Sequence, residues 1–418
     1  MVMLRGGAIE RLTGRGKGGA VASGSPWAIV LVLVLAFVGG ARPAQAQDPT
    51  YPPITDPNYN LDLFEQPALG SPRLIAMGGA ISPVSEGGAG LFTNPGSAAV
   101  RPETKGSRFS WNVYFNTYIP AKGQDSNNNG QAVTDVRRSL LGAAGLLVQY
   151  DKWGLSFDGG YTSHEIKPEA GGGLGVRSLI GHLTLARTFS DDSLAVGISL
   201  RAGGLQVFEL EGGDTLFTRG GLSAEAGVVW IPGEKNYRLA LSGGLPVYTG
   251  GLQYDCDPLD CYGYILPSGA VVPWDMTVGA GWRFGPTPWN HEVDSEFRDE
   301  RALIIAAELA VIGAVDNGYG VEAFAAKQLQ ASGREPSFTP RLGLEGEIFP
   351  GWLRLRAGTY LEAGRFEGVD ARLHGTGGGQ VRLFAVRLAG SERRVSISFA
   401  GDFAARYQNI GLSLGFWN

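Results

Sequence analysis

Apolar and polar residues alternate along this chain from about residue 108 onward. In the stretch DSLAVGISLRA, Leu194, Val196 and Ile198 share one face of an extended chain, while Gly197 and Ser199 share the other. Successive side chains of a β-strand point to opposite faces, so this period of two predicts strands. Segments of about ten residues with such alternation are typical of outer-membrane barrels, whose outer face meets lipid and whose inner face meets a hydrated lumen.

The sequence contains fourteen such segments. An even number of strands is what a bacterial barrel with both termini in the periplasm requires. The pattern therefore predicts an all-β protein, a transmembrane antiparallel β-barrel of about 14 strands over residues 108–418. We expect strands near 108–118, 138–150, 153–163, 177–189, 193–206, 218–231, 236–248, 271–284, 301–311, 340–349, 352–362, 378–389, 394–403 and 409–417.

Short and long connections alternate between the expected strands, as they do in outer-membrane barrels. The short ones (DKW, SDD, PGEKN, PGW and SERR) fall on the predicted periplasmic side, and the long ones (119–137, 164–176, 249–270 and 363–377) fall outside. The segment 285–300 is long for an inner turn. VEAFAAKQLQA, 321–331, has to lie in an outer loop, where its apolar spacing permits a short helix, and LIIAAELAVIG, 303–313, is expected to be a strand although a buried helix fits it too.

One hairpin allows a prediction of register. A two-residue turn at 350–351 places Glu347 opposite Arg354 and Glu345 opposite Arg356, with both pairs on the polar face. Opposite charges facing each other across two strands stabilise the pairing. A soluble sandwich would use the same pairs, so they support the register more than the membrane. Tryptophans are also expected at the periplasmic strand ends, where amphipathic rings favour the interface: Trp153, Trp230, Trp282, Trp352 and Trp417.

The end of the chain, NIGLSLGFWN, has the alternation of a last strand. It resembles the terminal signal by which bacterial barrel proteins are recognised for insertion, with Gly411, Leu414 and Phe416 at the matching places and two residues beyond the usual stop. The resemblance implies the barrel-assembly machinery as a partner during insertion and outer-membrane lipid as the surroundings of the folded barrel.

Residues 1–46 have the features of a secretory signal peptide: basic residues, an apolar centre at 27–38 and a small-residue cleavage site at Ala44-Gln45-Ala46. Cleavage near Ala46 leaves 30 Lys+Arg against 39 Asp+Glu, a net charge near −9, which gives no reason to expect nucleic acid. No apolar run after the leader is long enough for a spanning helix. These features predict the outer membrane of a Gram-negative bacterium as the location.

The two cysteines of the chain lie close together in QYDCDPLDCYGY. In an exported protein, Cys256 and Cys261 are expected to form a local disulfide that clamps a loop. A metal site would need more ligands than this stretch supplies, so we expect no metal there.

Residues 47–107 are left as a periplasmic N-terminal segment, which is apolar, glycine-rich and unlike a strand. We expect it inside the barrel, because glycines allow backbones to approach closely. Its core, RLIAMGGAISPVSEGGAGLFTNPGSAAV, resembles the hatch of the outer-membrane long-chain fatty-acid transporter (FadL-type) superfamily, which carries Arg-x-x-x-Met-Gly-Gly-Ala and then Asn-Pro-Ala. The motif falls on Arg73, Met77, Gly78, Gly79 and Ala80, then on Asn94 and Pro95, with Gly96 in place of alanine.

The resemblance implies a fourteen-stranded barrel with an internal hatch that passes hydrophobic small molecules, such as long-chain fatty acids, without a cofactor. It also implies a side opening at a kink in the third strand, for which Gly159-Gly160 is the candidate; ordinary barrel curvature is the alternative. Arg201 and Arg356 are possible contacts for a ligand carboxylate, although neighbouring glutamates more often balance such arginines.

Two other functions remain open at this stage. The superfamily also looks to include secretion shuttles (a PorV-like branch), so a non-transporting barrel that docks exported proteins is the first alternative. An enzyme is not expected: it would use His164, His182, His291 or His374 with a serine and a carboxylate, and the RLHGTGGG stretch, 372–379, is interpreted as a loop that precedes a strand.

Overall fold

The structure is a computed structural model that describes residues 51–64, 70–101, 108–121, 125–130, 139–166, 173–254, 256–388 and 391–417. The predicted signal peptide and its cleavage site lie outside these residues. Among the described residues, no helix is long and apolar enough to cross a membrane.

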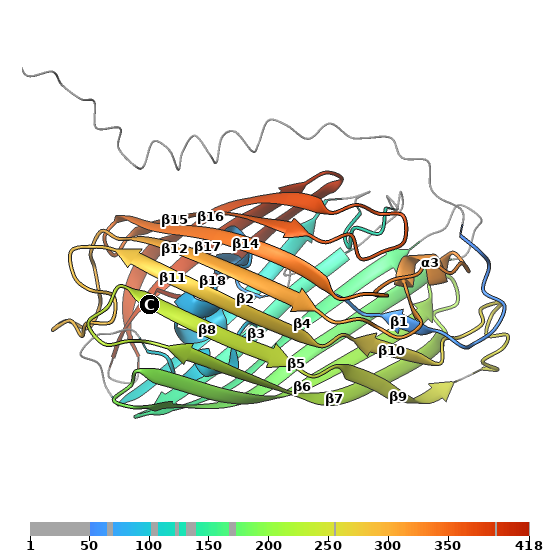
Figure 1. The fold of residues 1–418 in the computed structure, drawn as a ribbon, viewed down its shortest axis with the longest axis horizontal. Coiled ribbons are helices and arrows are strands. Elements are labelled where there is room, and N and C mark those ends of the chain that lie inside the picture. Colours follow the sequence, from blue (N-terminus) through green and yellow to red (C-terminus); the bar gives the residue numbers. More distant parts are fainter. Residues whose placement is uncertain are drawn as a thin grey trace, which may run out of the picture.

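Fourteen strands in the described part of the chain close into one antiparallel barrel, as the sequence predicts (Figure 1). Each strand pairs with the next along the wall, and the last pairs with the first through Asn409↔Pro120 to Gly415↔Tyr114. The wall strands are β2 (Phe109–Pro120), β3 (Ser139–Tyr150), β4 (Trp153–Ile166), β5 (Leu174–Phe189), β6 (Leu194–Glu209), β7 (Thr215–Trp230), β8 (Tyr237–Gly244), β11 (Asp275–Phe284), β12 (Leu303–Ile312), β14 (Ser337–Phe349), β15 (Leu353–Glu362), β16 (Arg372–Leu388), β17 (Ser391–Ala404) and β18 (Tyr407–Trp417).

The predicted alternation is what orients the side chains of the wall. Ile198 and Leu200 of β6 are exposed on the outside, whereas Ser199 between them is buried in the lumen. The same holds in β4, where Leu155 and Phe157 point outward. A wall with an apolar outer face and a polar inner face satisfies its backbone hydrogen bonds between strands, which is the condition for a strand to cross lipid.

The end of the barrel with the short connections, here called the short-turn end, differs in detail from expectation. The hairpin between β14 and β15 keeps the predicted pairs Glu347↔Arg354 and Glu345↔Arg356, but Phe349 pairs with Leu353, so the turn holds three residues and a bulge compensates. Gly351 accommodates the turn at φ 69°. The segment 285–302, long for a turn, folds back on the wall, where Asn290 accepts a 2.8 Å hydrogen bond from the Nε of Arg238 in β8.

Four of the five predicted tryptophans belong to an outward-facing set at this end: Trp153, Trp230, Trp282 and Trp352 are each 41–53% exposed. The prediction that Trp417 faces the membrane interface is wrong. This residue is only 2% exposed and faces the lumen, where its ring centroid lies 4.2 Å from the Arg354 guanidinium. Position 417 lies one residue past Phe416, and a shift of one residue reverses the face.

The opposite end, called here the long-loop end, carries the second correction. The stretch RLHGTGGG is no loop, because β16 begins at Arg372 and pairs regularly with β15. The helix expected in the outer loop is present as α3 (Val321–Ala325). Cys256 and Cys261 form a disulfide in the loop after β9 (Val247–Tyr254).

Two neighbouring strands break at matching places near this end. Leu245 and Pro246 separate β8 from β9, and Pro273 and Trp274 separate β10 (Gly269–Val272) from β11. Proline has no backbone N–H for the ladder, so it ends regular pairing. Beyond the break, β9 and β10 pair with each other and leave an edge on which a further strand lies.

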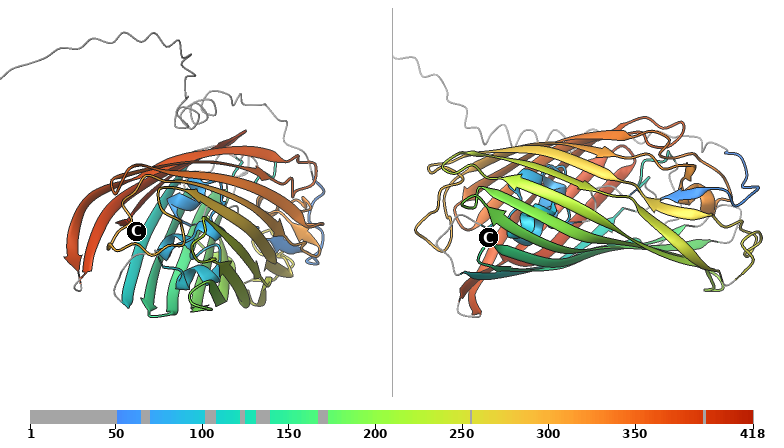
Figure 2. Two further views of the ribbon diagram at one scale, coloured as in Figure 1. Left: turned by 60° about the vertical axis from the view of Figure 1, so that its left-hand side comes forward. Right: turned by 60° about the horizontal axis from the view of Figure 1, so that its bottom comes forward.

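That further strand is β1 (Asn60–Asp62), which lies parallel to both β10 and β13 (Gly318–Tyr319). Figure 1 shows it beside α3 and β10, at the end of the barrel away from the C-terminus. Residues 51–63 are therefore at the long-loop end. Residues 70–101 lie inside the barrel (Figure 2), where they form α2 (Pro72–Ala76) and the 3-10 turns η1 (Ser82–Val84), η2 (Gly87–Gly90) and η3 (Pro95–Ala99).

Candidate functional site

The lumen with its N-terminal segment is the candidate site, and α2 makes the first of its attachments to the wall. Ser71 caps α2 by accepting a 3.1 Å hydrogen bond from the N–H of Leu74, and Pro72 occupies the first turn, where no N–H is required. The cap directs Arg73 at the wall, where its Nε and Nη2 donate to the two carboxylate oxygens of Glu345 at 2.9 and 2.7 Å. A bidentate pair of this kind fixes direction as well as distance.

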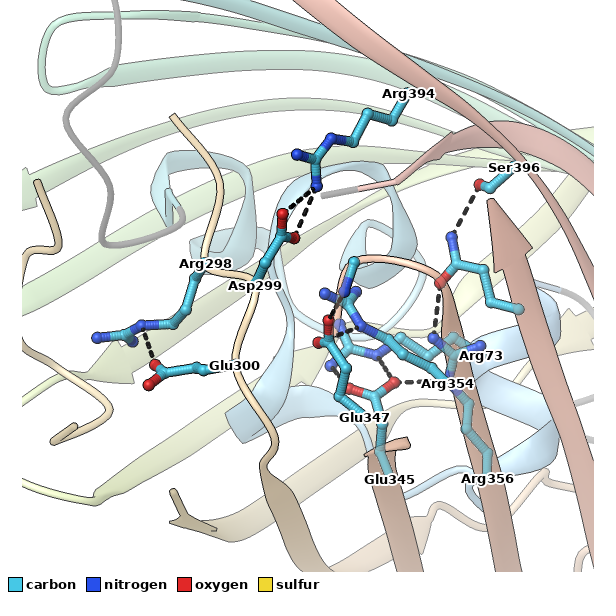
Figure 3. A network of polar contacts seen from close by, with 12 residues as sticks. Arg73, Arg298, Asp299, Glu300, Glu345, Glu347, Arg354, Arg356, Arg394 and Ser396 are labelled. Atoms are coloured by element: carbon cyan, nitrogen blue, oxygen red, sulfur yellow. Dashed lines mark hydrogen bonds and ion pairs between the residues drawn. The ribbon is translucent and has the colours of Figure 1, made fainter. Parts of the chain in front are cut away.

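We call residues 70–101 the hatch. Glu345 binds both Arg73 of the hatch and Arg356 of the wall, as Figure 3 shows. The Nε of Arg356 donates to the same carboxylate at 2.5 Å, and Arg356 Nη2 donates to Gln380, which in turn donates to Ser396. The network therefore crosses from α2 through β14, β15 and β16 to β17. Arg356, a predicted ligand contact, already has a carboxylate partner.

The backbone of the same turn touches the wall through glycines on both sides. Gly78 has φ 61°, and a Cβ there would lie 2.7 Å from the backbone N of Thr359. On the wall, a Cβ on Gly358 would lie 2.3 Å from the carbonyl carbon of Met77, and one on Gly343 would lie 2.6 Å from the Met77 oxygen. Such distances exclude any side chain, so these glycines are what lets the hatch and wall backbones meet.

The second attachment is Asn94-Pro95, on the other side of the lumen. Asn94 caps η3 by accepting a 2.8 Å hydrogen bond from the N–H of Gly96, and its Nδ2 donates to the carbonyls of Val228 and Leu241, both at 3.2 Å. One side chain thus satisfies the turn and ties it to β7 and β8.

Wall glycines again admit this turn. A Cβ on Gly197 would lie 2.3 Å from the carbonyl carbon of Pro95, and one on Gly227 would lie 2.1 Å from the Asn94 Oδ1. Gly96, which stands where the resembled motif has alanine, would place a Cβ 3.0 Å from the Gly227 oxygen and 3.1 Å from the Ala195 oxygen. The glycine here lets the turn approach the wall more closely than an alanine would.

A third contact joins η1 and η2 to the wall. Glu86 accepts a 2.6 Å hydrogen bond from Arg238, which is fully buried and lies 4.4 Å from the ring centroid of Trp289. The backbone N–H of Ser82 donates to Glu308 at 3.1 Å. Hydrogen bonds and ion pairs therefore hold the hatch to β7, β8, β12 and β14.

Two cavities flank the hatch. The one at the short-turn end, about 300 Å³, is lined by arginines and glutamates that include Arg73, Glu345 and Arg298. Burial, together with the neighbouring Arg283 guanidinium, lowers the pKa of Arg298, although Glu300 opposes this at 2.8 Å. The other cavity, about 170 Å³, lies on the long-loop side of the hatch and is here called the inner chamber. Both have charged linings, so neither is the continuous apolar pocket of a simple hydrophobic channel.

The long-loop end of the lumen is filled by an apolar core around β1. Tyr59 and Leu61 are buried against residues from the ends of β4 to β7, the disulfide loop and α3, including Phe217 and Phe324. Asp62 is held by Arg365, whose Nε donates to it at 2.7 Å, and by the hydroxyl of Ser332 at 2.6 Å. We call residues 51–63 the outer plug. Sequence reasoning missed it, although the alternation in NLDL was a usable signal.

The strand pairing around the predicted kink at Gly159-Gly160 is regular. Gly159 pairs with Ala144 and Gly181, and Gly160 pairs with Ala143 and Ile180, without a register shift on either side. A kink and a side opening at this pair stay a prediction. In the described strands, the paired regions also end at Pro246 and Pro273.

The remaining predicted residues lie apart from the hatch attachments. Arg201 lines the inner chamber and donates to Asp275 at 2.7 Å. Gly411 and Leu414 lie in β18, where Leu414 is exposed on the outer face, and Phe416 lies against Trp111 with ring centroids 5.3 Å apart. Whether these residues direct insertion stays a prediction.

The rings of two buried histidines have carboxylate partners. His182 Nδ1 lies 2.9 Å from Asp158, and His374 lies between Asp402 at 2.8 Å and Glu362 at 2.7 Å. His291 lies beside Glu234 at the short-turn end. These hydrogen bonds join imidazole to carboxylate and do not include the serine that an acyl-transfer triad places on the ring.

No protein-family model matches the chain, and no curated protein matches it by sequence. Solved structures do match. The CymD monoaromatic hydrocarbon channel is 12% identical, with 84% of this chain and 97% of that chain covered and a TM-score of 0.52. The toluene transporter TodX of Pseudomonas putida is 12% identical, with 85% and 99% covered and a TM-score of 0.51. A FadL homologue of Pseudomonas aeruginosa is 12% identical, with 84% and 98% covered and a TM-score of 0.49.

The predicted fold is confirmed: the chain has the fold of the CymD and TodX channels, a fourteen-stranded antiparallel barrel with an N-terminal segment inside it.

Proposed function

We propose that this protein lies in the outer membrane of a Gram-negative bacterium and passes hydrophobic small molecules, with residues 70–101 acting as a hatch. The observation that supports this most is an N-terminal segment held in the lumen of a barrel that has the fold of hydrocarbon channels. The apolar outer face and the polar inner face fit that location.

The hatch in this structure is closed, so passage requires it to move. Its attachments are ion pairs, hydrogen bonds and glycine contacts with a polar wall. When the hatch moves, water can replace these hydrogen bonds, because the lumen is lined by polar groups. A long-chain fatty acid stays one candidate substrate, and a small aromatic hydrocarbon is another.

Uptake measurements test this proposal. Cells that lack their own channels are given this protein, its insertion is confirmed, and uptake of labelled long-chain fatty acid and of labelled toluene is followed. We expect uptake of at least one, and a several-fold change when Asn94→Ala and Pro95→Ala are introduced together. Absence of uptake of both from an inserted barrel contradicts the proposal.

One observation favours the alternative, a barrel that docks exported proteins. The outer plug fills the long-loop end with a packed apolar core, and Leu259 and Tyr262 of the disulfide loop are exposed beside it. An inserted barrel that passes no hydrophobic probe, and that retains an exported protein which the double substitution Leu259→Ser and Tyr262→Ser releases, supports this second function.

A further inference from the structure

The inner chamber has one apolar side, which the N-terminal segment supplies. Leu63 reaches it from the outer plug, Phe64 follows directly after the plug, and Phe92 comes from the hatch, while wall residues such as Ile180 and Val272 complete it. Its volume is about 170 Å³. A cavity of roughly 150 Å³ is known to hold benzene, so the chamber has room for a body the size of one aromatic ring.

The wall side of the chamber is charged, and its two guanidinium groups already have partners. Arg201 pairs with Asp275 at 2.7 Å, and Arg341 pairs with Glu308 at 2.8 Å. Each pair is nearly buried and is neutral as a unit. A ligand carboxylate would therefore have to displace a carboxylate of the protein to gain a guanidinium here, which costs more than it returns.

Glu225 is left without a guanidinium partner. Its ion pair in the described part of the chain is to His182, whose Nε2 lies 3.9 Å away. The other ring nitrogen of His182 already lies 2.9 Å from Asp158, which is fully buried. One imidazole thus faces two carboxylates, so the group Asp158, His182 and Glu225 carries a net charge of −1 when all three are ionised.

A hydroxyl group in the lining of the same chamber lacks a partner as well. Ser82 of η1 lines the chamber, is buried to 1% exposure, and has no hydrogen-bond partner at its Oγ among the described residues. A buried polar atom of this kind is normally satisfied, so its position in a cavity wall indicates a missing donor or acceptor. It lies on the hatch, so whatever binds it touches the part that has to move.

We propose that the inner chamber binds the protonated amine of a small amphiphile, with the ammonium group at Glu225, Ser82 as a further hydrogen-bond acceptor, and an apolar body about the size of an aromatic ring against Phe92 and Phe64. The ammonium supplies the positive charge that the chamber lacks and has three donors to share. This inference rests on the proposed function, because it names the class of molecule that the hatched lumen takes.

The test uses three probes of similar shape and different charge: 2-phenylethylamine, phenylacetate and ethylbenzene. Binding to the full-length barrel in detergent is measured by calorimetry at pH 7. The amine is expected to bind at least tenfold more tightly than the other two. Glu225→Gln keeps the shape, removes the charge, and is expected to weaken amine binding about tenfold. Glu234→Gln, an exposed carboxylate at the short-turn end, serves as the control and leaves it unchanged.

Equal or tighter binding of phenylacetate, or full amine affinity in Glu225→Gln, overturns the inference. The heat-induced mobility shift of a folded barrel on electrophoresis shows whether the variant has folded. If it has not, the probe series on the unchanged protein decides. A second variant, Ser82→Ala, is then expected to weaken amine binding a few-fold. Uptake of ethylbenzene by cells that depends on the barrel, with no preference for the amine in binding, defeats this inference and leaves the proposed function standing. Amine binding at Glu225 without passage of any probe supports this inference and contradicts the proposed function.

Discussion

At the scale of single residues, the hatch depends on a few side chains and on glycines that have none. Asn94 caps its own turn and also reaches the wall, so one residue links secondary structure to tertiary contact, whereas Arg73 reaches the wall from a helix that Ser71 caps. The motif letters were visible in the sequence, and the register of Glu345 with Arg356 followed from a period of two. The partners of Arg73 and Asn94 were not predictable, because carbonyls and carboxylates from distant strands leave no local pattern.

We expect Arg73→Ala to loosen the hatch without unfolding the barrel. Glu345 keeps Arg356 as a partner, so the loss is that of charge-assisted hydrogen bonds, about 2 kcal/mol, and falls on the hatch. Planar-bilayer recordings are expected to show more frequent openings. Arg354→Ala, which removes the neighbouring wall pair with Glu347 and no hatch contact, is the control. Openings equally frequent in both variants would contradict the assignment.

Gly358→Ala tests the close backbone contact. The added methyl group would lie 2.3 Å from the Met77 carbonyl carbon, so the hatch has to move away or the barrel is destabilised by about 1–3 kcal/mol. Gly377→Ala in the adjacent strand is the matched control, since its nearest atom would be 3.6 Å away. Urea titration of the refolded barrels measures the difference, and equal midpoints would show that the contact is dispensable.

At the scale of elements, local alternation predicted the wall strands well, and the errors have physical causes. The turn at 350–352 gained a residue because a bulge absorbs one without changing the pairs further along. The stretch 372–379 was predicted as a loop because of its glycines. It is a strand whose inner face lies against a polar lumen and the hatch, and the local sequence does not show these surroundings. β1 was missed because a strand of three residues pairs in parallel with partners some 200 positions away.

A buried ion pair between Asp62 of the outer plug and Arg365 is one of the contacts that hold the plug in place. Arg365→Ala leaves the Asp62 carboxylate buried without its guanidinium, which costs about 3–5 kcal/mol when one partner of a buried pair is removed. Residues 51–63 are then expected to become cleavable by a protease added to intact cells. Arg334→Ala removes a pair in which Arg334 is 71% exposed and is expected to change nothing. Equal resistance of both variants would show that β1 is held by its backbone pairing instead.

At the scale of the whole molecule, the hatch spans the lumen, because α2 packs against β15 to β17 and η3 packs against β5 to β7. The Arg73 attachment is on β14, and the Asn94 attachment is on β7 and β8. The two attachments hold one segment to separate strands, so either one left intact still restrains it. We therefore expect Arg73→Ala combined with Asn94→Ala to raise probe uptake by more than the product of the two single effects, measured in one strain at equal barrel levels. A simply multiplicative result would mean that the attachments act independently.

The route of the chain also constrains assembly. Residues 51–63 end at the long-loop end, residue 101 lies at the short-turn end beside Arg108, and β2 then starts the wall whose last strand returns to it. Residues 51–101 precede the wall strands in the chain, and they lie inside a barrel that closes only when its last strand pairs with its first. The pairing of β2 with β18 therefore has to form around an N-terminal segment that is already inside. A delay in placing that segment would leave the barrel as an open sheet at the moment of insertion.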